Sequence, residues 1–349
     1  MQNYIVCILG RLLLACKKDR RYCMITKNRS FGIGLLLVFL AASLFANGEQ
    51  EQSEKAWPAK SVQIVVAFNP GGDTDYNARV YAKYLKDILG VPVVVTNVTG
   101  SGGTIGMRHV LDSDPDGYTV LWHHSAMMVS EAAGLWDKNA NDYEISCIGA
   151  KSAGVLLYAD GSAPYNSFDD VVAATKKTPD AITFAANTGA TTYLAGVTLY
   201  EQGVKFKLAD FGGGSDRLAA LMGGHVDIIP NAYGMMKDYI DSGDVKALAS
   251  LGSERIEEAP DVPTVAELGF PDSTLDMLYF FAFPKGTSRE IVETWADAAE
   301  EVAKNPQYQE EIHKAYFQKP FYLRGNDALD ALNGQREVIM KYAELLKVN

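Results

Sequence analysis

Short apolar runs alternate along this chain with stretches in which apolar residues recur at helical spacing. The runs are four to seven residues long and rich in β-branched side chains, a composition typical of buried strands. We therefore expect a strand in each of them. They occupy residues 62–68, 93–96, 118–122, 155–158, 182–186, 226–229, 245–251 and 278–283.

The stretches between these runs predict helices. Residues 75–89 place Tyr81, Tyr84, Leu85 and Ile88 on one face, which is the spacing of an amphipathic helix. Shorter helices are expected nearby, and the chain becomes mostly helical after residue 283. The further predicted helices cover residues 169–177, 217–222, 288–304, 306–316 and 326–346.

Strands that are separated by helices indicate an α/β fold with parallel sheets and right-handed crossovers. A chain of 349 residues is long enough for two lobes with substantial cores. In sheets of this kind, ligands bind beyond the carboxyl ends of the strands. We therefore expect the ligand-binding residues in the segments that follow the predicted strands.

The N-terminal segment has the pattern of an export signal. Lys27 and Arg29 precede an apolar run at residues 31–45, which is followed by Ala46-Asn-Gly48. The run is shorter than the roughly 20 apolar residues that span a bilayer. We predict cleavage near residues 46–48, a true translation start at Met24, and a mature protein in the periplasm. No Cys follows the apolar run, which disfavours a lipid anchor.

The charge of the predicted mature chain disfavours a nucleic-acid partner. Removing residues 1–48 takes away seven Lys and Arg and one Asp, so the net charge changes from −11 to −17. Cys7, Cys16 and Cys23 also lie in the removed part. Cys147 alone remains, so we expect no intrachain disulfide in this soluble protein, which we predict to be a monomer.

Two glycine-rich turns carry the strongest functional signal. They are Phe68-Asn-Pro-Gly-Gly-Asp-Thr-Asp75 and Asn97-Val-Thr-Gly-Ser-Gly-Gly-Thr-Ile-Gly106, and each lies between a predicted strand and a helix-like stretch. Small residues leave the first N–H groups of a helix uncovered, where unpaired donors and the helix dipole attract anions. The first turn could instead be only a tight turn with Thr74 or Asp75 as N-cap. Two such turns in one βαβα unit favour a protein that holds a small anion.

Two later segments have the same character. Thr183-Phe-Ala-Ala-Asn-Thr-Gly-Ala-Thr191 and Asp210-Phe-Gly-Gly-Gly-Ser-Asp216 each place small polar residues at the end of a strand. A single loop of this kind usually serves only as a turn. Four of them near strand ends indicate two facing walls of a polar cleft.

The glycine-rich segments do not match the signatures of nucleotide-binding proteins. Ile105 stands where a dinucleotide fingerprint needs its third glycine, and no acidic residue follows at the spacing of the ribose contact. The chain also lacks the Gly-x-x-x-x-Gly-Lys sequence of phosphate-loop enzymes. We therefore expect no nucleotide cofactor.

Enzyme and metal signatures are equally weak. The five histidines show no metal-binding spacing, and Ser152 lies in a segment that falls one glycine short of a nucleophile elbow. We expect structural roles for His123 and His124, because adjacent strand residues point to opposite faces of a sheet. The sequence predicts no metal, no cofactor and no catalytic residue.

Five segments together resemble the substrate-binding receptors of tripartite tricarboxylate transporters, also called the Bug family. Ala67-Phe-Asn-Pro-Gly-Gly-Asp-Thr-Asp75 is similar to the family's first signature block, and residues 97–106 are similar to the second. Three further blocks follow in the family's order across the mature chain. They are Asp114-Pro-Asp-Gly-Tyr-Thr-Val-Leu121, Leu221-Met-Gly-Gly-His-Val-Asp227 and Pro260-Asp-Val-Pro-Thr-Val-Ala-Glu-Leu-Gly269.

The resemblance implies a two-lobe periplasmic binding protein of type II, the Venus-flytrap fold. Each lobe would be a mainly parallel sheet flanked by helices, with the ligand in the cleft between the lobes. Residues 49–152 and 277–349 would form lobe 1, and residues 153–276 would form lobe 2. The protein would deliver a small organic carboxylate to a permease with one large and one small membrane subunit. A sensory module for a sensor kinase and, less favoured, an exported hydrolase remain as alternatives.

The resemblance also implies the ligand contacts, with Asp75 as a helix cap. In the first lobe they would be Phe68, Asn69, Gly72, Asp73, Thr74, Ser101, Gly102, Gly103 and Thr104. In the second lobe they would be Asn187, Thr188, Gly189, Thr191, Gly212, Ser215, Asn231 and Tyr233.

None of these residues is Arg or Lys, so N–H, hydroxyl and amide groups would hold the ligand's charge. Two departures from the family pattern bear on selectivity. Thr99 replaces a common Pro, and Phe211-Gly212 stands where relatives often carry Tyr followed by Lys or Arg. The loss of that cation favours a monocarboxylate or another weakly charged acid.

Overall fold

A computed structural model describes residues 57–152 and 154–347. The chain divides into two units, Met1–Ala56 and Trp57–Asn349. The predicted export signal, its cleavage site and the Met24 start lie outside the described residues. Within those residues, no helix combines the length and the apolar character that crossing a membrane requires.

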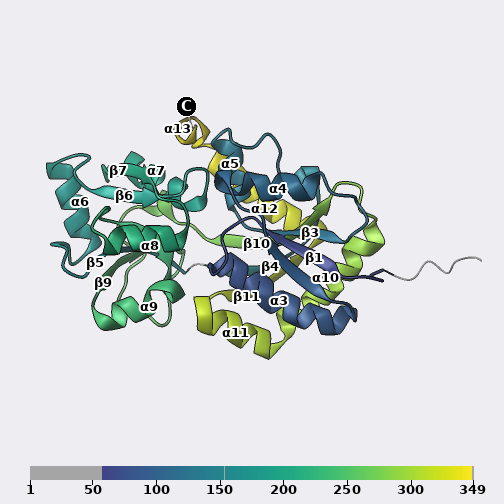
Figure 1. The fold of residues 1–349 in the computed structure, drawn as a ribbon. Coiled ribbons are helices and arrows are strands. Elements are labelled where there is room, and N and C mark those ends of the chain that lie inside the picture. Colours follow the sequence, from purple (N-terminus) through teal and green to yellow (C-terminus); the bar gives the residue numbers. More distant parts are fainter. Residues whose placement is uncertain (1–56, 153, 348–349) are drawn as a thin grey trace, which may run out of the picture. The chain divides into compact units, whose positions relative to one another are not determined.

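A six-stranded sheet organises one part of the described chain, with the order β11-β4-β10-β3-β1-β2 (Figure 1). β1 pairs in parallel with β2 and β3, whereas β10 and β11 run antiparallel to their neighbours. The strands are β1 Val62–Val66, β2 Val93–Asn97, β3 Thr119–His123, β4 Tyr143–Ser152, β10 Met277–Pro284 and β11 Lys319–Arg324.

Helices cover both faces of this sheet. α3 and α11 lie on one face, and α4, α5 and α12 lie on the other (Figure 1). The helices are α3 Asp73–Leu89, α4 Thr104–Leu111, α5 Ala126–Ala132, α10 Arg289–Lys304, α11 Pro306–Tyr316, α12 Gly325–Met340 and α13 Ala343–Leu346. Short 3₁₀ turns at η2 Ser101–Gly103, η3 Ala140–Asp142 and η4 Pro271–Ser273 complete the connections.

A second group of strands comes from the middle of the chain. β8, β5 and β9 form an antiparallel sheet, β6 and β7 pair in parallel, and a bridge between Phe184 and Ile228 joins the two. The elements are β5 Val155–Asp160, α6 Phe168–Lys177, β6 Thr183–Ala186, α7 Thr191–Glu201, β7 Lys207–Asp210, α8 Gly214–Met222, β8 Ile229–Ala232, α9 Tyr233–Ser242 and β9 Val245–Ser250.

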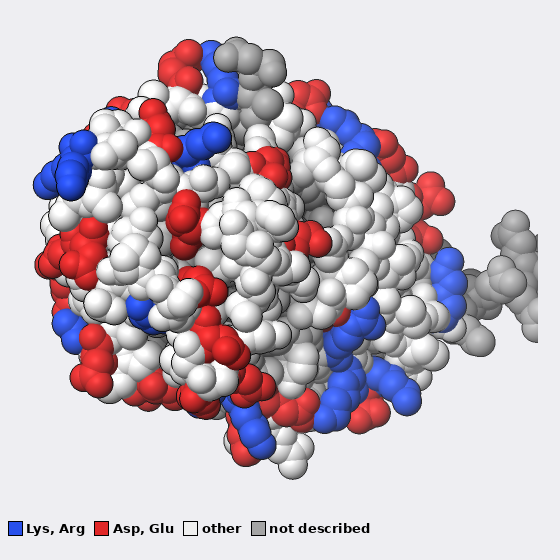
Figure 2. Space-filling view, turned by 60° about the vertical axis from the view of Figure 1, so that its left-hand side comes forward, with Lys and Arg blue, Asp and Glu red and all other residues white. Residues whose placement is uncertain are grey.

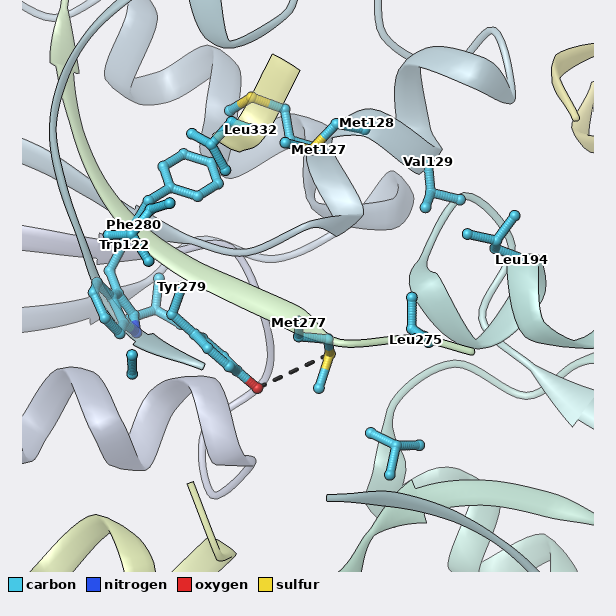
Figure 3. Close-up of a cluster of buried hydrophobic side chains, with 14 of the residues drawn as sticks. Trp122, Met127, Met128, Val129, Leu194, Leu275, Met277, Tyr279, Phe280 and Leu332 are labelled. Atoms are coloured by element: carbon cyan, nitrogen blue, oxygen red, sulfur yellow. Dashed lines mark hydrogen bonds between the residues drawn. The ribbon is translucent and has the colours of Figure 1, made fainter. Parts of the chain in front are cut away.

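Aromatic side chains fill the core of the six-stranded sheet. Trp122 on β3 packs against Phe281 at 4.3 Å between ring centroids, and Phe281 in turn contacts Trp295 of α10 at 5.2 Å. Figure 3 shows Tyr279 lying beside Trp122, whereas Phe280 points to the other side of β10, toward Leu332. The Trp122 indole donates to the carbonyl of Thr74 at 3.1 Å, so the core fixes the first turn of α3.

The predicted strands correspond to observed strands, with one displacement. β8 begins at Ile229, so the strand expected at residues 226–229 is shifted toward the C-terminus. The helix expected over residues 326–346 is interrupted between α12 and α13. Three strands that the apolar pattern did not predict are β4, β7 and β11.

Charged groups of both signs are dispersed over the surface. Figure 2 shows acidic side chains predominating on one face, with basic side chains among them. This distribution agrees with the acidic net charge of the whole chain, which is −11.

Candidate functional site

A cavity of about 500 Å³ lies where loops from the two groups of strands face each other. One wall, called here the first wall, consists of the segments that follow β1, β2 and β3. The second wall consists of the segments that follow β6, β7 and β8. The volume lies in the range of small-molecule sites, about 300–1,000 Å³. The position matches the carboxyl ends of strands, where ligands of α/β sheets bind.

Most of the predicted contact residues line this cavity. They are Phe68, Asn69, Gly72, Asp73, Thr74, Ser101, Gly102, Gly103, Asn187, Thr191, Gly212, Ser215 and Asn231. The other four lie beside it without lining it. Thr104 is buried at the start of α4, Thr188 and Gly189 lie in the turn before α7, and Tyr233 packs on Phe317.

The first wall begins with the turn between β1 and α3. Gly72 is the N-cap of α3 and makes no side-chain cap. The N–H groups in the first turn of a helix have no intrahelical acceptor, and here Gly72, Asp73 and Thr74 line the cavity. This end of α3 therefore presents donors and the positive end of the helix dipole to a ligand.

Asp75 holds this turn to the second glycine-rich loop. Its carboxylate accepts the N–H of Gly71 at 2.9 Å, the amide of Asn97 at 2.8 Å and two bonds from Arg79. Asn97 also donates to the carbonyl of Phe68 at 3.0 Å. Burial raises the pKa of Asp75, but the bonds from Arg79, Gly71 and Asn97 outweigh it and lower the pKa below its usual value. The expected cap role thus becomes a bridge between two loops.

The second glycine-rich loop has an unusual backbone. Gly100, Ser101, Gly102 and Gly103 all have positive φ, at 129°, 47°, 65° and 96°. A Cβ on Gly103 would lie 2.9 Å from Nε2 of the buried His123, so a side chain there would displace the loop. The sequence needs glycine at this position to bring the chain down onto the core and to begin α4 beside the cavity.

His123 and His124 do not point to opposite faces, contrary to the prediction. β3 ends at His123, so His124 lies beyond the alternation of the strand. Both rings pack against Phe68, and His124 is nearly parallel to it at 4.7 Å between centroids. Burial lowers the pKa of each histidine to about 3.

His124 also lines the cavity, which the sequence analysis missed. Its Nδ1 accepts the N–H of Ala126 at 3.2 Å. A neutral imidazole that accepts at Nδ1 carries its proton on Nε2. His124 is therefore an uncharged donor in the first wall.

The second wall is built from loops that bond mainly to themselves. The N–H of Asn187 donates to Thr192 Oγ1 at 3.0 Å, which shapes the turn before α7. Asp216 accepts the N–H of Gly213 at 3.1 Å and so caps α8. Burial raises the pKa of Asp210, but bonds from Thr188 and Gly212 lower it overall.

Arg217 is the most important residue that the sequence analysis missed. It lines the cavity from α8, and only 7% of its surface is exposed. Its guanidinium donates to the carbonyl of Pro230 at 3.1 Å, to Asn231 Oδ1 at 3.0 Å and to the carbonyl of Gly212. Burial lowers its pKa to about 10, against the carboxylates of Asp73, Asp216 and Asp210. Arg217 therefore adds a cation to the lining of a cavity whose predicted contact residues include none.

Asp73 places a carboxylate in the first wall. Tyr279 donates its hydroxyl to Asp73 Oδ2, and Figure 3 shows this hydroxyl directed toward Met277, which also lines the cavity. Burial, followed by the charge of Asp73, raises the pKa of Tyr279 well above 10. The phenol thus stays protonated and donates to the carboxylate.

Ser130 joins the loops of the two walls. Its hydroxyl lies 2.7 Å from the carbonyl oxygen of Gly189 and 3.1 Å from that of Gly102. A hydroxyl has one proton, so it donates to one of these oxygens at a time. The loops after β2 and β6 are consequently close enough for one hydroxyl to reach a carbonyl oxygen of each.

Among residues 57–152 and 154–347, no cluster of three or more His, Cys, Asp or Glu could hold a metal ion. Ser152 is buried, and its hydroxyl accepts the N–H of Gly154 at 3.2 Å. The arrangement of the cavity suits the binding of an anion by donors from both walls.

Known proteins share this sequence pattern and fold. A family model described as the tripartite tricarboxylate transporter family receptor matches residues 77–337. The chain is 33% identical over 250 residues to protein BugT of Bordetella pertussis, which covers 69% of this chain and 75% of BugT.

Solved structures agree. The structure of the periplasmic binding protein BugD superimposes with a TM-score of 0.73 at 28% identity, covering 83% of this chain and 97% of BugD. MatC of Rhodopseudomonas palustris with bound malate shares the fold at a TM-score of 0.73 and 23% identity, covering 83% of this chain and all (100%) of MatC.

Proposed function

This chain belongs to the receptor family of tripartite tricarboxylate transporters, and from that premise we propose that it captures a small organic carboxylate in the periplasm. It then delivers the acid to a membrane permease with one large and one small subunit. The relative BugD is a periplasmic binding protein, and MatC carries malate. The export-signal pattern before residue 49 supports the same compartment.

One observation carries the proposal: both glycine-rich turns of the first wall reach the same cavity, each beside the start of a helix. Each charge-assisted hydrogen bond nets about 1.5–3 kcal/mol, and a helix terminus adds about 0.3–1 kcal/mol. Four to six such bonds sum to about 6–18 kcal/mol, and most of this range exceeds the ~8 kcal/mol of a micromolar complex. The remainder offsets the cost of ordering the loops.

Release and capture would depend on movement between the walls. The polypeptide crosses between the two groups of strands near residues 152–155 and 275–277. We propose that residues 49–152 with 277–349, and residues 153–276, move as two lobes about these crossings. A ligand that contacts both walls selects the closed arrangement, because only that arrangement offers all its contacts. The proposed role is binding and delivery without turnover.

A charge placed in the second glycine-rich loop tests the proposal. Ser101→Asp adds a carboxylate beside the proposed anion site, and Asp tolerates the positive φ of 47° at this position. We expect it to weaken carboxylate binding at least about tenfold by calorimetry. Ser101→Asn is the matched control, because it has nearly the same shape without the charge and should bind almost as the wild type does. Equal affinity of the two variants would contradict an anion at this loop.

A further inference from the structure

One cation, Arg217, lines the proposed cavity together with two carboxylates, Asp216 beside it and Asp73 on the opposite wall. The pair formed by Arg217 and Asp73 bears on which acids fit. Arg217 projects from α8 in the second wall, whereas Asp73 begins α3 in the first wall. Both side chains line the same cavity, so the two charges face the same space.

Arg217 lacks a carboxylate partner among the described residues. Its three bonding partners are neutral oxygens from Gly212, Pro230 and Asn231, and no ion pair within 4.0 Å involves it. A guanidinium has five N–H groups, two on each terminal nitrogen. The bonds to Gly212 and Asn231 use one N–H on each terminal nitrogen, which leaves two for a ligand. A buried charge without a counter-charge is costly, so this site favours an incoming anion.

We infer that Arg217 binds a second acidic group of the ligand, and that Asp73 opposes a third. The first acidic group would lie at the glycine-rich turns, where donors are neutral. The second would lie at the two remaining N–H groups of Arg217, an arrangement that suits bidentate carboxylate binding. A further carboxylate would meet Asp73, whose partner Tyr279 is neutral. The site would thus prefer doubly charged acids to both singly and triply charged ones.

This inference rests on the proposed function and revises the selectivity expected from the sequence. The missing cation at Phe211-Gly212 predicts a weakly charged acid. In the structure, Arg217 lies five residues further along and donates to the carbonyl of Gly212 itself. The cation that this loop lacks is therefore supplied from the first turns of α8.

A series of acids on one carbon skeleton provides the test. Butyrate, glutarate and tricarballylate carry one, two and three carboxylates on a propane chain. We expect the wild type to bind glutarate at least about tenfold more tightly than either of the others, measured by calorimetry at one ionic strength. Arg217→Gln should remove the advantage of glutarate over butyrate, and Arg217→Lys should restore part of it. Asp73→Asn should narrow the gap between glutarate and tricarballylate.

The controls separate failure of the inference from failure of the proposed function. Asp238→Asn removes an exposed carboxylate of α9 that does not line the cavity, so it should leave the order of the three acids unchanged. If wild-type protein binds butyrate as tightly as glutarate, the inference is overturned while carboxylate binding stands. If none of the three acids binds, the proposed function falls and the inference with it. Because Arg217 also supports its own loop, the wild-type series alone decides the matter should Arg217→Gln fail to fold.

Discussion

At the scale of single residues, two neighbouring aspartates of α3 have opposite roles. Asp75 is 3% exposed, and its carboxylate oxygens accept hydrogen bonds from Gly71, Arg79 and Asn97, so it acts within the protein. Asp73 is partly exposed and lines the cavity. The sequence motif contains both, and its pattern alone does not tell which carboxylate faces the ligand. The two roles are distinguished only in the folded chain, where Asn97 at the end of β2 donates to Asp75.

Asp75→Asn should destabilise the fold. The amide cannot accept all the bonds that the carboxylate accepts, so we expect the free energy of unfolding to fall by about 2 kcal/mol at pH 7 in a denaturant titration. The folded-state pKa of Asp75 is lowered, so its contribution is complete above the unfolded pKa of 3.8 and is lost as the pH falls through the folded value. The deficit should therefore shrink at strongly acidic pH. Asp87→Asn, an exposed change on the same helix, is the control.

His123 and His124 predict a loss of stability at mildly acidic pH. Each has a pKa of about 3 when folded, against 6.5 as the reference value. Below pH 6.5 the unfolded chain takes up protons that the folded protein excludes, so the unfolding free energy falls by up to about 1.4 kcal/mol per pH unit for each histidine. His124→Phe keeps an aromatic ring on Phe68 and should make this decline shallower between pH 7 and pH 5. If stability falls with pH as steeply in His124→Phe as in the exposed control His109→Gln, the low folded-state pKa of His124 is refuted.

At the scale of elements, the sequence predicts helices with one apolar face and misses α7, which is buried on all sides. α3, α6 and α10 show the expected spacing, and their polar residues mark the exposed side. α7 is buried along most of its length, including its threonines, so it has no contrasting faces to detect. β4 contains serines, a glycine and a lysine that interrupt an apolar run, yet it pairs with both β10 and β11.

The candidate site likewise contains some residues that the sequence predicts and others that it does not. The glycine-rich turns were predictable because small residues and positive φ are local properties of a segment. His124 and Arg217 were not, because their importance comes from packing: one stacks on Phe68 and the other is bonded to the loop of Pro230 and Asn231. From the sequence alone, a cation near the start of a helix such as Arg217 is expected at the surface. Its burial becomes evident only when the position of the facing strand is known.

The glycine at position 103 should be required by the geometry of the second loop. Gly103→Ala combines a φ of 96° with a Cβ only 2.9 Å from His123, whereas Gly134→Ala has a φ of 74° and open space around the new methyl group. Both should cost about 1–2 kcal/mol of stability because alanine resists positive φ. Gly103→Ala alone should also weaken glutarate binding at least about tenfold, since the loop must move. Calorimetry showing intact binding in Gly103→Ala would remove this loop from the site.

At the scale of the whole described unit, an ion pair joins the two crossings between the strand groups. Lys151 near the end of β4 contacts Asp276, which precedes β10, at 2.7 Å. Asp276 also accepts two bonds from Ser253, and its carbonyl accepts the amide of Gln335 on α12 at 2.8 Å. None of these residues lines the cavity. The crossings are thus fastened to each other independently of the ligand site.

Asp276→Ala should consequently separate stability from binding. The loss of the carboxylate's bonds to Lys151 and Ser253 should lower the unfolding free energy by about 1–2 kcal/mol, because the pair is only partly exposed. Stabilisation by a ligand depends on its concentration relative to Kd, and at 100 times Kd it amounts to about 2.7 kcal/mol. If the crossings only connect the two groups of strands, glutarate should add this same increment to variant and wild type in chemical denaturation. A smaller increment in Asp276→Ala, with Glu254→Ala at an exposed ion pair as control, would mean that the crossings help to set the bound arrangement of the walls.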